Sequence, residues 1–87
     1  MIIYDEDHER FINGISILLS KQELLELRDK INCLVDSPKG ELEHFHVANK
    51  SYQKEITVSM YTYENISQYS PVFREEISRN LLEDAET

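Results

Sequence analysis

The sequence is poor in the residues that mark several classes of protein. It contains one cysteine, two glycines, two prolines and no tryptophan. The single cysteine, Cys33, cannot form an internal disulfide, which favours a reducing compartment, and we expect a cytoplasmic location. Two glycines are too few for a glycine-rich loop that cradles phosphate groups.

Long apolar runs are missing as well. No run approaches the roughly 20 residues that cross a membrane as a helix. The start, MIIYDEDHER, lacks the basic region and the long apolar stretch of a signal peptide. We therefore expect neither a membrane partner nor a signal peptide.

Charge is strongly one-sided. Seventeen acidic residues face nine basic ones, so the formal net charge is −8. Such a chain repels phosphate backbones, and we expect no nucleic-acid ligand. A basic protein is the more natural partner, because complementary charge speeds encounter, although the same charge also serves solubility.

The 87 residues predict a single domain over 1–87. Forty per cent of them are hydrophobic, enough for one modest core. Residues 1–10 pass from apolar to acidic and predict an arm or an edge strand. Residues 84–87 are charged and predict a frayed tail.

Five elements follow from the pattern of apolar residues. Alternation predicts strands over 11–19, 41–47 and 53–62, and a 3.6-residue period predicts helices over 21–35 and 71–83. Together they predict an α+β fold with two layers in the order β-α-β-β-α. A small, mainly antiparallel sheet would carry both helices on one face.

The first helix has a clear start and a predicted buried side. Ser20 and Glu23 form a capping box. Glu26 and Lys30 form an i,i+4 pair that we place on the opposite, exposed side. The predicted buried stripe consists of Leu24, Leu27, Ile31, Leu34 and Val35. From the last strand we expect Val58 and Met60 in the core.

His44 and His46 are the most conspicuous polar pair. Residues two apart in a strand point to the same face, so both histidines oppose Phe45 and Val47, which we assign to the core. Thr57, Ser59 and Tyr61 would share the face of the histidines.

A metal or catalytic site is the least favoured interpretation of this pair. Zinc needs a third ligand, and Glu41 and Glu43 point to the other face. No motif supplies an oxyanion hole or an orienting acid beside Thr57 or Ser59. We predict no enzyme, metal or cofactor. A metal-dependent enzyme using the two histidines stays as a rival hypothesis.

The two remaining interpretations are a recognition surface and a merely solvated sheet face. For recognition, we also assign the acidic residues of the N-terminal segment to steering a basic partner. The predicted partner-binding residues are His44, His46, Thr57, Ser59, Tyr61, Asp5, Glu6 and Asp7.

Three stretches together resemble a known family. A Ser-capped leucine helix follows "ISILLS", and "SPKGELEHFHV" and "YQKEITVSMY" come after it. Residues 15–61 thereby resemble small immunity proteins of bacterial polymorphic-toxin and contact-dependent growth inhibition systems. The resemblance implies an inhibitor that binds a cognate toxin domain, often a nuclease, in the cytoplasm. It assigns no binding residue, because these vary with the toxin. The alternative is a small homodimeric binding or regulatory module whose open sheet face pairs with itself.

Overall fold

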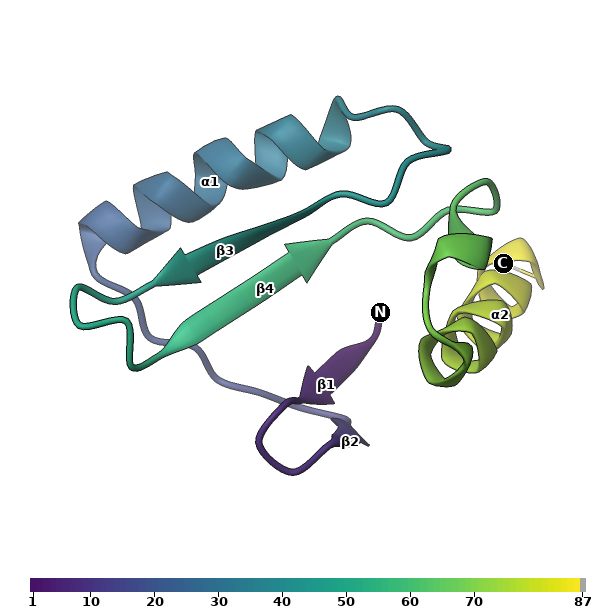
Figure 1. Ribbon diagram of the computed structural model, residues 1–87, viewed down its shortest axis with the longest axis horizontal. Coiled ribbons are helices and arrows are strands. Elements are labelled where there is room, and N and C mark those ends of the chain that lie inside the picture. Colours follow the sequence, from purple (N-terminus) through teal and green to yellow (C-terminus); the bar gives the residue numbers. More distant parts are fainter. Residues whose placement is uncertain (87) are drawn as a thin grey trace.

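The fold is α+β, as predicted, but it contains two small sheets in place of one. A computed structural model describes residues 1–86, with side chains up to residue 83. The order of elements is β-β-α-β-β-α (Figure 1). The elements are β1 (Ile3–Asp5), β2 (Arg10–Ile12), α1 (Lys21–Val35), β3 (His44–Ala48), β4 (Glu55–Ser59), the short 3-10 helix η1 (Ile66–Gln68) and α2 (Pro71–Glu86).

The prediction of a single sheet with both helices on one face is wrong. β1 pairs only with β2, and β3 pairs only with β4, both antiparallel. The strand predicted over 11–19 is also wrong, because pairing stops at Ile12 and residues 14–20 have no regular structure. Asn13 and Gly14, both poor strand formers, stand where the strand ends. Residues 1–10 form most of the β1–β2 hairpin, so the edge-strand alternative holds and the loose arm does not.

Helix α1 has the predicted bounds and the predicted start. The Ser20 hydroxyl accepts a hydrogen bond from the Glu23 N–H at 3.1 Å, and the Glu23 carboxylate accepts one from the Ser20 N–H at 2.9 Å. The capping box thereby satisfies one N–H group at the helix start and holds the chain that enters it.

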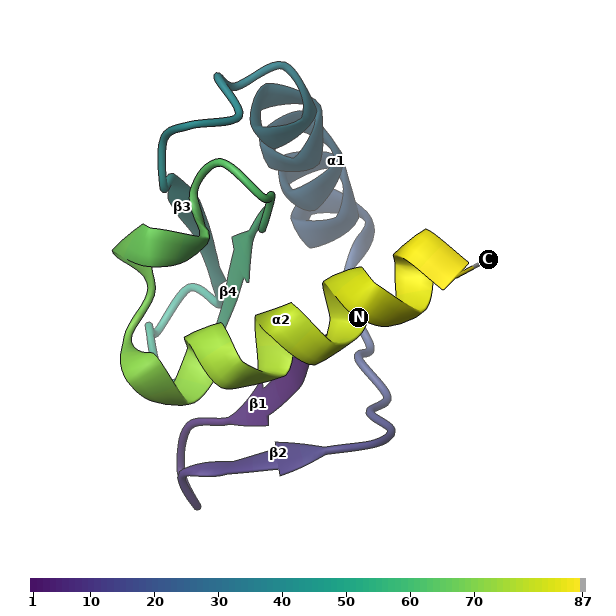
Figure 2. The same ribbon diagram turned by 90° about the vertical axis from the view of Figure 1, so that its right-hand side faces the viewer.

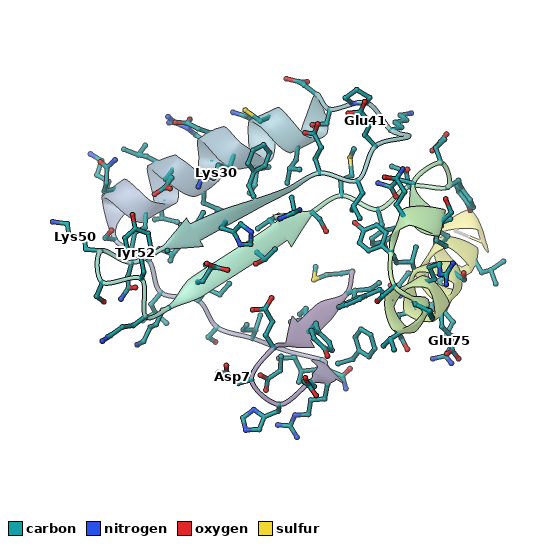
Figure 3. All side chains as sticks on the ribbon, viewed as in Figure 1. Asp7, Lys30, Glu41, Lys50, Tyr52 and Glu75 are labelled. Carbon is teal, nitrogen blue, oxygen red and sulfur yellow. The ribbon has the colours of Figure 1, made fainter. Side chains whose placement is uncertain are left out.

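The β3–β4 hairpin shows the predicted alternation. Val47 is buried, and Phe45, Ile56 and Val58 are half-buried on the same face. Helix α1 runs along β3 (Figure 1). Lys30 lies between helix and strand, where its ammonium group donates to the carbonyl of His46 (Figure 3). The Glu26–Lys30 pair forms at 2.9 Å, but next to the sheet and not on the opposite side as we predicted.

The predicted buried stripe of α1 is only partly correct. Leu34 is 4% exposed and Leu27 is half-buried, whereas Ile31 is 41%, Leu24 53% and Val35 67% exposed. A sheet of two strands is narrower than the stripe, and nothing in the described chain covers its other edge. The predicted burial of Val58 and Met60 is partial, since both are half-buried.

Helix α2 packs against the β1–β2 hairpin rather than beside α1 (Figure 2). The Phe73 ring meets the rings of Tyr4 and Phe11 edge to face, with centroids 4.9 and 5.7 Å apart. Ile77 is 1% exposed, as its place in the apolar stripe of α2 predicts. The helix runs past residue 83 to Glu86, and the predicted fraying of residues 84–87 stays a prediction. Thr87 and the side chains of 84–86 lie outside the described residues.

Asn65 ties the loop after β4 to the segment before β3. It is fully buried. Its side-chain oxygen accepts from the Thr62 N–H, and its amide group donates to the carbonyls of Glu41 and Met60. Thr62 returns the contact, because its hydroxyl accepts from the Asn65 N–H at 3.0 Å. The loop is therefore held by polar bonds where apolar packing is thin.

The molecule is unusually open for its length. Its radius of gyration is 14.0 Å, against about 12 Å for a compact domain of this size. Its accessible surface is 6934 Å², against roughly 5,400 Å² for a folded monomer of this mass. Both measures indicate surface that a compact domain would bury.

Candidate binding site

Four of the predicted site residues lie on one exposed face of the β3–β4 hairpin. His44 stands opposite Ser59, and His46 opposite Thr57. All four are exposed. The two imidazole rings meet edge to face with centroids 4.9 Å apart. The period-2 prediction for these four side chains is confirmed. We call them, together with Glu55, the open face.

Glu55 is a member of the open face that sequence reasoning missed. The Nδ1 atom of His46 lies 2.8 Å from a Glu55 carboxylate oxygen and 3.0 Å from the Thr57 hydroxyl. Glu55 has the same parity as Thr57 and stands diagonally across from His46, a neighbour relation that the β3–β4 register would have supplied. The two contacts involve the Nδ1 atom and fix the orientation of the imidazole.

The geometry around His46 differs from that of a catalytic histidine. A general base uses one ring nitrogen for the orienting carboxylate and the other for the nucleophile. Here the carboxylate and the hydroxyl meet the same nitrogen. Within the described residues, no group of three His, Cys, Asp or Glu side chains could hold a metal ion. The cluster is therefore suited to presenting an ordered imidazole to a partner.

Tyr61 lies outside the regular part of strand β4. β4 ends at Ser59, so the alternation that would have carried Tyr61 outward is lost. Tyr61 is half-buried, and its hydroxyl accepts from the N-terminal ammonium of Met1 at 3.5 Å. Tyr69, which we did not predict, also reaches the open face. Its hydroxyl donates to the Ser59 hydroxyl at 3.0 Å.

The three acidic residues of the predicted site have different roles. The Asp5 carboxylate accepts from the backbone N–H groups of Asp7 and His8 and lies 2.8 Å from the His8 ring. The His8 side chain is the main reason why the pKa of Asp5 is lowered, and these contacts order the β1–β2 turn. Asp7 is exposed in the turn between β1 and β2 (Figure 3). Only Glu6 lines a groove.

Two grooves flank β4, one towards each of its ends. The first, of about 480 Å³, is lined by residues 15–19, Glu23, 47–49 and 54–56. The second, of about 430 Å³, is lined by Met1, Ile2, Tyr4, Glu6, 57–59, Tyr61, Tyr69, Phe73 and Ile77. The structure thus brings Thr57, Ser59, Tyr61 and Glu6 together along the second groove. His44 and His46 stay outside both.

Comparison with known proteins adds no relative. No protein family model, no curated protein and no solved structure matches the chain. No helix in the described part of the chain is long and apolar enough to cross a membrane. The resemblance to immunity proteins therefore stays a prediction.

Proposed function

We propose that the protein acts by binding another protein and is an immunity protein that neutralises a toxin domain in the cytoplasm. It works by stoichiometric association and not by catalysis. The binding function is supported by the geometry of the chain. The toxin as partner is supported by the sequence resemblance over residues 15–61, and nuclease activity is the toxin class that this resemblance most often implies.

The observation that carries the proposal is the excess of exposed surface. The accessible surface of 6934 Å² exceeds the expectation for a folded monomer by about 1,500 Å². A standard protein–protein interface buries about 800 Å² on each partner. The protein therefore has more than enough unburied surface for one stable interface without unfolding any element.

Charge and order at the site fit a protein ligand. The net charge of −8 favours a basic partner. The open face offers histidine, threonine and serine side chains held by His46–Glu55 and Tyr69–Ser59 contacts. Side chains ordered before binding lose less entropy when a partner docks.

A homodimer is the second candidate, and one observation favours it. Ile31, Leu24 and Val35 on α1 are exposed, and so are the apolar side chains of residues 15, 17 and 18. Exposed apolar side chains in such number can mark a surface for self-association. The net charge of −8 on each copy opposes it.

Co-expression tests the proposal. A toxin domain captured with this protein from the native host would be expressed alone and together with this protein, and the mass of the complex would be measured by light scattering. We expect restored growth and a one-to-one complex. Absence of both binding and rescue would overturn the toxin-inhibitor function. A stable homodimer that binds no toxin would support the second candidate.

A further inference from the structure

The backbone of β4 has an unpaired edge. The Asn49 N–H donates to the Lys54 carbonyl at 3.1 Å, so this opposed pair is a hydrogen-bonded one. Hydrogen-bonded and non-hydrogen-bonded pairs alternate in an antiparallel ladder. The backbone N–H and C=O groups of Glu55, Thr57 and Ser59 therefore point away from β3. Those of Ile56 and Val58 point towards it.

A second contact supports the same alternation of hydrogen-bonded and non-hydrogen-bonded pairs between β3 and β4. The carbonyl of His46 accepts from Lys30 of α1, so it faces away from β4. His46 is opposed to Thr57, and in a non-hydrogen-bonded pair both residues face outward. Helix α1 thus occupies the outer side of β3. Within the described residues, no hydrogen bond reaches the outward backbone groups of Glu55, Thr57 and Ser59.

Residues 15–19 lie across the first groove from this edge. They line the groove together with residues 54–56 of the hairpin. They belong to no helix or strand, although their sequence, ISILL, has strong strand propensity. Ile15, Ile17 and Leu18 are 58%, 48% and 89% exposed. The start of the unpaired β4 edge and an apolar segment outside any strand therefore line the same groove, together with residues 47–49.

We propose that β4 accepts an extended segment of the partner protein as an added β-strand, lying between β4 and residues 15–19. Its backbone pairs with the outward groups of Glu55, Thr57 and Ser59, the mode of recognition in which main-chain bonds give affinity. The sheet would grow from two strands to three. This inference rests on the proposed binding function. It adds which kind of partner segment binds and at which edge of the sheet.

The groove linings define that chemistry. Side chains of an added strand would alternate between the apolar side of the hairpin, beside Ile56 and Val58, and the side of the open face. Acidic side chains line both grooves, Glu23 and Glu55 in the first and Glu6 in the second. Among the described residues, Lys54 is the one basic residue that lines either of these two grooves. The occupant is therefore a strand in which apolar and basic residues alternate.

Thr57→Pro isolates the strand-pairing step. Proline removes the Thr57 N–H, which points outward, and edge strands tolerate proline at such positions. Thr57→Val is the matched control, because it also loses the hydroxyl contact with His46 but keeps the N–H. Circular dichroism and the urea midpoint of both variants would establish that they fold.

The probe is a random library of displayed heptapeptides, selected on the wild-type protein. We expect enriched peptides to alternate apolar and basic residues, and Thr57→Pro to weaken their binding about tenfold or more, since an anchoring backbone bond is lost. Thr57→Val shows the effect of losing the hydroxyl alone, so the backbone bond is measured as the further loss of about tenfold from Thr57→Val to Thr57→Pro. Protection of the Thr57 amide from hydrogen exchange by a bound peptide would support pairing directly.

Several outcomes would overturn the inference. These are a selection that enriches no peptide, peptides that bind Thr57→Pro as tightly as Thr57→Val, and a Thr57 amide already protected by a second copy or by residues 15–19. Failure of the proposed function is a separate result. A toxin that binds wild type and both variants equally would leave the binding function standing and remove only the added strand.

Discussion

At the scale of single residues, buried polar bonds compensate for a thin apolar core. Asn65 is fully buried and bonds to Thr62, Glu41 and Met60. The sequence contained a local signal for the first of these bonds. Thr62 and Asn65 stand three apart, the spacing at which short polar side chains exchange bonds with the backbone. The bonds to Glu41 and Met60 join distant segments, which local patterns do not describe.

Asn65→Ala should lower the free energy of unfolding by about 2–4 kcal/mol, because the fully buried side chain is lost, the carbonyls of Glu41 and Met60 lose a donor and the Thr62 N–H loses its acceptor. Ser67→Ala, on an exposed neighbour, is the control and should change it by less than about 0.5 kcal/mol. Urea denaturation monitored by circular dichroism measures both. Equal, small losses of stability in both variants would show that the hydrogen bonds of Asn65 contribute little to the free energy of unfolding.

The start of α1 should depend on pH. The Ser20 N–H that donates to Glu23, and then the Ser20 hydroxyl, lower the pKa of Glu23 below its ordinary value of 4.5. A lowered pKa stabilises the fold above the unfolded value, and this contribution is lost as pH falls through the folded value. Stability should therefore fall more between pH 5 and about pH 3 in the wild type than in Glu23→Gln. An equal loss of stability in the wild type and in Glu23→Gln, measured by urea denaturation, would contradict the lowered pKa of Glu23.

At the scale of elements, local signals predict α1 and the β3–β4 hairpin well. The capping box gives the helix start, and alternation places His44, His46, Thr57 and Ser59 on one face. The predictions that failed concern how elements pack against one another, which local patterns do not describe. Residues 15–19 have strand propensity but no partner strand, so β propensity did not become a strand. The predicted strand up to residue 62 was too long for a related reason, since β4 ends at Ser59 and strand alternation no longer applies to Tyr61.

The orientation of α1 gives a sharp comparison of two apolar residues. Leu34→Ala should cost about 2–5 kcal/mol, since Leu34 is buried against β3. Ile31→Ala should cost less than about 1 kcal/mol, since Ile31 is 41% exposed. Thermal and urea unfolding of the two variants measure the difference. A larger loss of stability for Ile31→Ala than for Leu34→Ala would support the buried stripe predicted from the sequence. It would mean that another element or a second copy of the chain covers Ile31.

At the scale of the whole molecule, the large exposed surface and the negative charge both favour binding to a different protein. A chain with a radius of gyration of 14.0 Å and a net charge of −8 leaves surface unburied and repels its own copies. Composition predicts the charge, but it does not predict the openness, which results from two small sheets that do not join.

Small-angle X-ray scattering with light scattering tests this openness. We expect a monomer of 10.3 kDa whose radius of gyration exceeds the roughly 12 Å of a compact domain. A mass twice that of the chain at micromolar concentration would instead favour the homodimer.

Amide hydrogen exchange along β4 of the free protein tests the central claim, an open strand edge ready for a partner, most directly. The amides of Ile56 and Val58, which point towards β3, should exchange slowly, and those of Thr57 and Ser59 should exchange at nearly the rate of an unprotected chain. That alternation is the predicted result. Slow exchange at Thr57 and Ser59 as well would mean that the edge is already paired, and it would contradict the account.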